Sequence, residues 1–311
     1  MESFLMAAQV VVPMAIMVGI GVMLRITKIT DRDTMKKMDK ITYHLLMPVL
    51  MFYNIYKTDF SQLKTIGYIL YGLVGLTVIF LAALFLVPRI IKERPTAAAF
   101  GQAIIRPNYI IFGTAVAQSI YGDGNIGMIL LMGAVAVPFF NSMSAIVLEA
   151  GRHGTSSPRK LLKAVVTNPN LIATAIGLAV NFMGINLPFL VLDVVQDLSG
   201  LVTPISFLSI GVSLSVTIST RKSYLISGVL LRLILIPLVF LVGGIMLGYR
   251  GQELCSLMIL FAAPTAVSSY PMAVAMDADG EFAGQIVAVS TICCLPTIFL
   301  WTLILNSMQL I

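Results

Sequence analysis

The hydrophobic and polar positions of the chain are arranged in long blocks. Apolar runs of about 20 residues, the length that spans a bilayer as a helix, follow one another with short polar segments between them, such as "RITKITDRDTMKK", "PRIIKERPT" and "DADGE". The pattern predicts ten membrane-spanning helices, over residues 4–24, 38–57, 65–87, 97–121, 126–149, 164–184, 188–217, 224–248, 253–277 and 281–306. No polar segment could hold a soluble domain, so we predict an all-α polytopic membrane protein.

Composition agrees with this class and argues against others. Of the 311 residues, 58% are hydrophobic and 11% are charged, whereas soluble domains carry roughly 25% charged residues. The first apolar run has Glu2 as its only preceding charge and is too long for a signal-peptide core, so we expect a retained span. The three cysteines lie in apolar runs without metal-ligand spacing. We found no catalytic triad, metal cluster, phosphate loop or nucleic-acid module, and we predict a protein that is not an enzyme and needs no cofactor.

The distribution of lysine and arginine predicts the orientation, because these residues favour cytoplasmic loops. With the N-terminus outside, fifteen of the 20 basic residues fall in inside loops: Arg25, Lys28, Arg32, Lys36, Lys37, Lys40, Arg89, Lys92, Arg94, Arg152, Arg159, Lys160, Lys163, Arg221 and Lys222. Three fall outside, namely Lys57, Lys64 and Arg250, and two, Arg106 and Arg232, fall within spans. We therefore expect a cell-membrane protein with both termini extracytoplasmic, and we attribute its net charge of +6 to these loops.

Prolines repeat at a nearly constant offset between the two halves of the chain. Pro48 and Pro204 are 156 residues apart, Pro107 and Pro264 are 157 apart, and Pro138 and Pro296 are 158 apart. Halves of five spans each, an odd number, must lie in opposite orientations, which is the inverted-repeat plan of many secondary transporters. We predict one repeat over residues 1–149, a short cytoplasmic loop over 150–163 and a second repeat over 164–311.

Pro107 and Pro264 each lie about 11 residues into a predicted span, which at ~1.5 Å per residue is near the middle of a ~30 Å membrane core. A proline removes a backbone donor, and unpaired backbone at that depth is tolerated only inside protein or beside a water-filled cavity. Small or polar residues follow each proline: Asn108 and Tyr109 in one half, and Thr265, Ser268 and Ser269 in the other. We predict two broken helices that meet at the midplane and offer helix N-termini, at Asn108–Tyr109 and Thr265–Ala266, to an anionic substrate. Ser268 and Ser269 are expected to supply further hydrogen bonds to it. The alternative is a pair of simple kinks.

Arg106 stands directly before Pro107, where a charge costs about 2.5–3.5 kcal/mol on insertion scales. No Asp or Glu lies near a span centre in this assignment, so an ion pair is not evident. A guanidinium binds a carboxylate with two parallel hydrogen bonds, and we predict that Arg106 binds substrate. A structural arginine capped by carbonyl groups is the alternative.

Four further polar residues have weaker assignments. Asn54 and Asn141 lie inside apolar spans, and each either lines a cavity or bonds between helices; we include Asn54 among the expected substrate-binding residues. His44 is expected to be a buried histidine with a satisfied ring, with a proton relay as the alternative. Arg232 is expected to snorkel or to find a partner.

Five segments in order resemble the auxin efflux carrier family, which includes bacterial malonate and malate permeases. They are "LLMPVLMFYNI", "NYIIFGTAVAQSIYG", "TNPNLIATAIGLAVNFMGINLP", "TPISFLSIGVSL" and "APTAVSSYPMAVAMDAD". The chain departs from the family at Ala115, where many members have a second proline, and its short central loop is similar to that of bacterial members. The resemblance implies a ten-helix fold similar to bile acid/sodium symporters, with helices 4 and 9 crossing at the substrate site, organic anion substrates and homodimers.

We therefore expect a secondary transporter of small carboxylates such as malate or malonate, working by alternating access. An inside-negative potential favours anion export, since moving one charge across 100 mV costs about 2.3 kcal/mol, and uptake would need a co-transported proton or cation, or exchange. One alternative is a cation/proton antiporter of the same fold, which would need a titrating carboxylate at the crossing. Another is a sensor that binds anions without transporting them.

Overall fold

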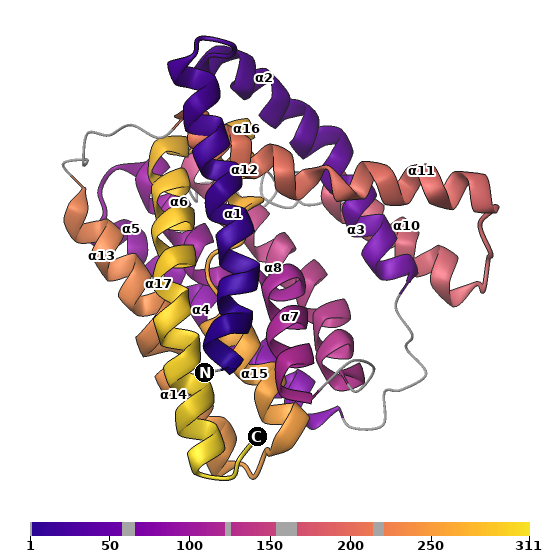
Figure 1. Cartoon of the computed structure of the whole chain (residues 1–311), viewed down its shortest axis with the longest axis vertical. Coiled ribbons are helices and arrows are strands. Elements are labelled where there is room, and N and C mark those ends of the chain that lie inside the picture. Colours follow the sequence, from indigo (N-terminus) through magenta and orange to yellow (C-terminus); the bar gives the residue numbers. More distant parts are fainter. Residues whose placement is uncertain (1, 58–65, 122–125, 154–166, 214–220) are drawn as a thin grey trace.

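The computed structural model describes residues 2–57, 66–121, 126–153, 167–213 and 221–311, and within them it is built of helices (Figure 1). The elements are α1 Glu2–Ile26, α2 Arg32–Ile41, η1 Thr42–Leu46, α3 Met47–Tyr56, α4 Gly67–Phe85, α5 Val87–Ile90, α6 Arg94–Ile105, α7 Tyr109–Tyr121, α8 Gly127–His153, α10 Pro169–Phe182, α11 Phe189–Gly200, α12 Val202–Ser213, α13 Lys222–Leu230, η3 Leu231–Leu235, α14 Ile236–Met246, α15 Gly251–Ala262, α16 Ser269–Ala275 and α17 Gly280–Ser307. The η elements are single π-helical turns.

Helices occupy most of the described part of each predicted span, and within the described residues five helices are long and apolar enough to cross a membrane. These five are Gly67–Ile90, Gly127–Arg152, Phe189–Val212, Lys222–Met246 and Gly280–Ser307. Shorter apolar helices cover Ala15–Ile26, Pro169–Phe182 and Gly251–Ala262. Within the described residues the all-helical prediction is confirmed. Most of the predicted central loop, 150–163, lies outside the described residues, and α8 extends to His153.

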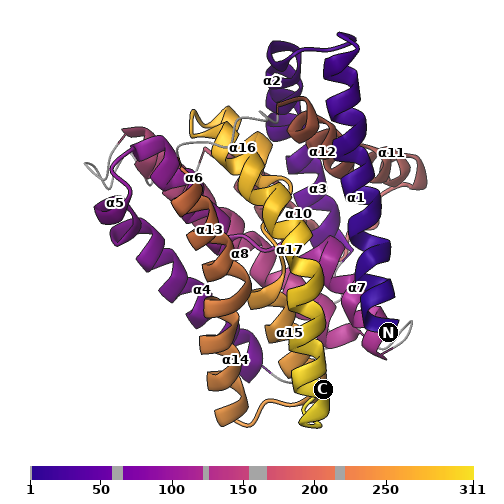
Figure 2. The ribbon, with the colours of Figure 1, turned by 60° about the vertical axis from the view of Figure 1, so that its left-hand side comes forward.

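The helices form two bundles (Figure 2). The smaller bundle contains α1, α2, η1, α3, α10, α11 and α12, in which α1 packs along α12 and α3 packs along α10 and α11. The larger bundle contains α4 to α8 and α13 to α17. Each bundle therefore takes helices from both halves of the chain, and the two bundles meet where α1 packs against α7 and α17 and where α2 packs against α16.

Close backbone contact holds the smaller bundle together. A Cβ atom on Gly211 of α12 would lie 2.1 Å from the carbonyl oxygen of Val18 and 2.8 Å from the Cα of Gly21, both on α1. Only glycine permits this approach, because any side chain would overlap the backbone of the facing helix. The helices α1 and α12 are therefore a fixed pair.

Beyond the two breaks that the sequence predicted, prolines coincide with interruptions of several other helices, although α8 and α17 continue through Pro138 and Pro296. A proline cannot donate to the carbonyl four residues earlier; a π-helical turn precedes Pro48, another precedes Pro237, and a turn at Leu201 separates α11 from α12 before Pro204. The indole of Trp301 donates to the carbonyl of Leu233, 3.0 Å away, which is the acceptor that Pro237 leaves without a helical donor. The helix α7 continues through Ala115, the position at which the sequence departs from the family pattern that it resembles.

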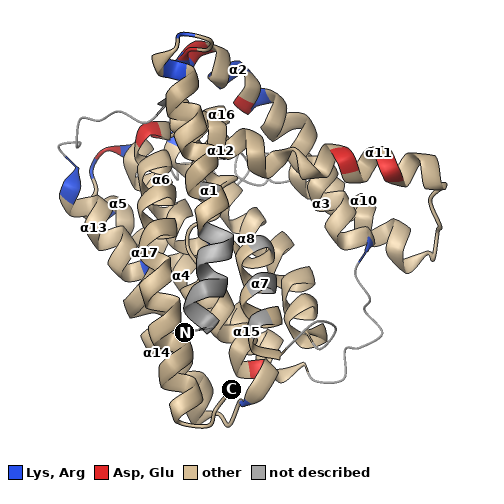
Figure 3. Ribbon diagram, viewed as in Figure 1, with Lys and Arg blue, Asp and Glu red and all other residues tan. Residues whose placement is uncertain are grey.

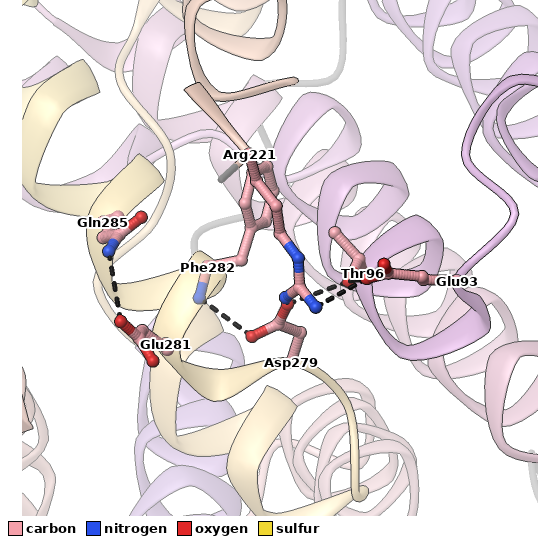
Figure 4. Close-up of polar contacts among 7 residues, drawn as sticks. All are labelled: Glu93, Thr96, Arg221, Asp279, Glu281, Phe282 and Gln285. Carbon is pink, nitrogen blue, oxygen red and sulfur yellow. Dashed lines mark hydrogen bonds and ion pairs between the residues drawn. The ribbon is translucent and has the colours of Figure 1, made fainter. Parts of the chain in front are cut away.

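Basic residues gather at one end of the molecule, around α2, α5 and the start of α13 (Figure 3). An ion-pair cluster at this end joins the starts of three helices of the larger bundle (Figure 4). Arg221, before α13, pairs with Glu93, before α6, at 2.5 Å and with Asp279, before α17. Asp279 also accepts from the hydroxyl of Thr96 at 2.9 Å and caps α17 at the N–H of Phe282. The cluster lies wholly within the larger bundle and fixes its helices relative to one another.

Candidate functional site

Two interrupted helices cross inside the larger bundle, as the matched prolines predicted. The first is α6 and α7, with the break at residues 106–108, and the second is α15 and α16, with the break at 263–268. At the crossing the two broken segments run antiparallel, with an isolated β-bridge between Pro107 and Thr265. The N–H of Asn108 donates to the carbonyl of Pro264 at 2.8 Å, and the N–H of Ala266 donates to the carbonyl of Arg106 at 3.0 Å. Each break thereby satisfies backbone groups of the other.

Arg232 caps both broken helices from behind. Its side chain has no exposed surface, and its guanidinium donates to three carbonyl oxygens: Ile104 at the end of α6, and Leu260 and Ala263 at the end of α15, at 2.9–3.0 Å. These are terminal carbonyls without an intrahelical donor, and a positive charge suits the negative end of a helix. The sequence led us to expect an arginine that snorkels or finds a partner; the structure gives it three carbonyl partners and a structural role.

Arg106 is equally buried, with 1% of its surface exposed, but it is bonded quite differently. Its Nη1 donates to the sulfur of Met272 at 3.3 Å, its Nε has no partner, and none of the ion pairs among the described residues includes it. It directly follows the last residue of α6 and has an extended backbone conformation (φ −103°, ψ 96°), so its side chain does not continue the helical arrangement of the α6 side chains. A weak sulfur acceptor leaves most of the hydrogen-bonding capacity of this cation unused.

A cavity of about 250 Å³ lies beside Arg106, between the two bundles. Among the described residues, one cation, several amides and several hydroxyls line it, and no acidic residue does. Its polar lining is Arg106, Asn54, Asn108, Asn141, Tyr53, Tyr109, Ser199, Thr203 and Ser268. A neighbouring cavity of about 320 Å³ shares Met51, Asn54 and Val137 with it and reaches the exposed Lys57. The lining is thus positively charged on balance.

Several predicted site residues come together at this cavity. The side-chain nitrogen of Asn108 is buried without a partner, and α7 begins directly after it, at Tyr109. The hydroxyl of Tyr109 is committed to the carbonyl of Ile129 at 2.9 Å, so this residue contributes its backbone. Asn141 both lines the cavity and donates to the sulfur of Met51 on α3, at 2.8 Å, so its two proposed roles coexist.

The second broken helix differs in detail from the prediction. We expected a half-helix starting at Thr265, but α16 begins at Ser269, because the N–H of Thr265 donates to Ser290 Oγ and that of Ala266 donates at the crossing. The hydroxyl of Thr265 donates to the carbonyl of Ala103 at 3.1 Å. Thr265 and Ser269 do not line the cavity, whereas Ser268 does. This half therefore offers a hydroxyl and not a long helix N-terminus.

The expectation for His44 needs correction. This residue was expected to be buried, but its ring is exposed, with Nδ1 3.0 Å from the carbonyl of Lys40. It lies on the outer face of the π-helical turn, which the apolar pattern alone did not reveal. The described residues contain no group of three His, Cys, Asp or Glu able to hold a metal.

Sequence reasoning missed the contribution of the α11–α12 junction. Ser199, Gly200 and Thr203 line the cavity from this side. The available signal was Pro204, which cannot donate to the carbonyl of Gly200 and so interrupts the helix at Leu201. The match of Pro204 with Pro48 does not by itself indicate that the turn before Pro204 lines the cavity.

Comparison with known proteins agrees with the geometry. The model of the membrane transport protein family matches residues 6–158 and 149–302, nearly the whole chain. An uncharacterized transporter of Methanothermobacter thermautotrophicus is 22% identical, and the alignment covers 97% of this chain and 99% of that protein.

Proposed function

The chain belongs to the membrane transport protein family, that of the auxin efflux carriers, and on this premise we propose that it is a secondary transporter of small organic anions, mono- or dicarboxylates such as malate or malonate. The observation that carries the proposal is Arg106. A buried guanidinium with a single sulfur partner, beside a cavity without a lining acid, lacks the compensating negative charge that buried cations require. A carboxylate supplies that charge and matches the guanidinium fork with two hydrogen bonds.

The rest of the lining suits a small acid. In this proposal the amides of Asn108 and Asn54, the hydroxyl of Ser268 and the first N–H groups of α7 at Tyr109 bind the remaining oxygens. The cavity of about 250 Å³ is below the roughly 300–1,000 Å³ of sites for drug-sized ligands. Thr265, which does not line the cavity, holds the crossing in place through its hydrogen bonds to Ser290 and Ala103, and Ser269 has no part in binding in this proposal.

The orientation and the transport cycle follow from charge and architecture. If the basic end lies in the cytoplasm, the cavity beside Lys57 leads to the extracytoplasmic side, and both termini lie there too. We propose that residues 1–149 and 164–311 are inverted five-helix repeats of a ten-helix cell-membrane protein. The smaller bundle would then move against the larger one, exposing Arg106 to each side in turn, and homodimers are compatible with this motion.

The test is flux of labelled malate and malonate in proteoliposomes. Arg106→Ala should abolish saturable flux and substrate binding, and Arg106→Lys should retain only weak binding because the fork is lost. Arg250→Ala is the matched control: this exposed arginine bonds backbone carbonyls away from the cavity, so flux should persist. Undiminished flux in folded Arg106→Ala protein would refute the carboxylate role.

The same vesicles separate the alternatives. An imposed potential should drive anion flux toward the positive side, and a pH or sodium gradient would reveal a coupling ion. Cation flux that persists without any organic anion would indicate an antiporter. Saturable binding without flux under every gradient would indicate a sensor.

A further inference from the structure

A buried acid lies outside the anion site. The carboxyl group of Asp39, on α2, has no exposed surface. Its Oδ2 accepts a hydrogen bond from the hydroxyl of Ser209 on α12 at 2.9 Å, and its Oδ1 is buried without a hydrogen-bond partner. The Tyr270 hydroxyl on α16 faces the same carboxyl. None of the ion pairs among the described residues includes Asp39.

The described elements packed against α2 carry no lysine or arginine. The helix α2 packs against η1, α12 and α16; η1 carries Tyr43 and His44, α16 carries Tyr270, and α12 carries no titratable residue. The ring of His44 is exposed, and the hydroxyl of Tyr43 bonds with Asn168 and Met276. On α2 itself, Lys36 is exposed and pairs with Asp33, and Lys40 is exposed. A carboxylate charge buried in this way is costly, whereas a neutral carboxylic acid between two hydroxyls is not.

The short helix α16 connects this acid with the anion site. Ser268, just before α16, lines the cavity, and Met272 on α16 accepts the single hydrogen bond of Arg106. Tyr270, between them in the sequence, faces Asp39. Asp39 and Ser209 belong to the smaller bundle and α16 to the larger, so their contact crosses the interface between the bundles.

We propose that Asp39 is a proton-binding site whose protonation holds the two bundles together at the basic end of the molecule. When the bundles separate there, water reaches Asp39 and the carboxyl ionises; the proton must return before the interface can close with the acid buried. Low pH on that side therefore favours the conformation in which the basic end is closed. The proton site does not depend on the substrate, but its effect on transport rests on the proposed function.

Infrared spectroscopy of the purified protein tests the protonation directly. At neutral pH the wild type should show the carbonyl band of a protonated carboxylic acid, shifted in deuterated water and absent in Asp39→Asn. Persistence of the same band in Asp39→Asn, or its absence from the wild type across the whole range from acid to neutral pH, would overturn the proposal.

Thiol labelling tests the conformational effect without substrate. In a background lacking Cys255, Cys293 and Cys294, Met276→Cys places a thiol opposite Tyr43 at the same interface. When Asp39 is present, the labelling rate of this thiol should rise several-fold with pH. In Asp39→Asn the interface should stay closed, so the rise should be smaller and should reflect only the ionisation of the thiol itself. Equal pH profiles would overturn the proposal, and a dependence on sodium instead of pH would indicate a metal cation at Asp39.

A second variant, with a smaller change at the site, keeps the test decisive if Asp39→Asn fails to fold. Ser209→Ala removes one donor to the ionised carboxylate, so the labelling midpoint should move to higher pH while the amplitude persists. An unmoved midpoint in folded protein would count against the site. Because labelling needs no anion, it would still report on Asp39 if the flux experiment with Arg106 failed.

Discussion

At the scale of the residue, the two buried arginines of the larger bundle have opposite roles. Arg232 has three carbonyl partners and Arg106 has a single sulfur. The sequence could place both within spans and could single out Arg106 by its proline, but it could not assign the partners. Those partners are backbone carbonyls freed at two distant helix ends, which become acceptors only when the breaks meet.

The contrast predicts opposite effects on stability. Arg232→Ala leaves three terminal carbonyls without a donor in the protein interior and should destabilise the fold by roughly 3 kcal/mol or more. Arg106→Ala removes an uncompensated charge and should leave stability unchanged or raise it. The measurement is thermal unfolding in detergent, followed by the fluorescence of Trp301, the only tryptophan. Equal losses for the two variants would mean that Arg106 is also structural.

At the scale of the element, the crossing depends on close approach of α7 and α15. A Cβ atom on Gly113 of α7 would lie 2.3 Å from Cγ2 of Ile259 on α15, and Ile259 is fully buried. Gly113 lies in the segment "NYIIFGTAVAQSIYG" that carries part of the family resemblance, but the sequence could not name its contact, because Ile259 lies nearly 150 positions away in the chain.

Substitutions at Gly113 and Ile259 should partly compensate for each other, because one adds side-chain volume at their contact and the other removes it. Gly113→Ala should cost about 1–3 kcal/mol through overpacking, and Ile259→Ala about 2–4 kcal/mol through the cavity it leaves. The double variant should be more stable than the sum of the two losses allows. Strict additivity, measured by denaturant or thermal unfolding, would show that the two helices do not touch there.

At the scale of the whole molecule, the apolar blocks predicted the helices well, and the midspan prolines Pro107 and Pro264 predicted the two breaks that cross, whereas α8 and α17 continue through the matched prolines Pro138 and Pro296. They did not predict how the helices divide into bundles. The pairing of α1 with α12 depends on the facing glycines Gly21 and Gly211, and nothing in an apolar pattern says which span a glycine faces. Likewise, Asp39 lies near the start of the predicted span 38–57, and the sequence does not indicate that α12 and α16 pack against α2 and that this acid is buried.

If the bundles move as units, a covalent link between them should stop transport, while a link within one bundle should not. A bifunctional thiol reagent joining Tyr43→Cys on η1 to Met276→Cys after α16 spans the interface and should abolish flux until reduced. The same reagent joining Glu93→Cys to Arg221→Cys, both in the larger bundle, should leave most of the flux. Comparable inhibition by both links would argue against movement between these two bundles.

The hydrogen bonds at the crossing also affect how the protein is made. The partner of the Asn108 N–H is the carbonyl of Pro264, which lies 156 residues later in the chain. At ~5–20 residues per second, the ribosome needs about 8–30 s to synthesise the intervening residues. Throughout that interval the first half must hold an unpaired backbone donor and an uncapped helix end within the bilayer, where such groups are costly. The newly inserted first half therefore cannot complete its fold alone. Until the second half is inserted, the insertion machinery or water within the membrane must supply partners for these unpaired backbone groups.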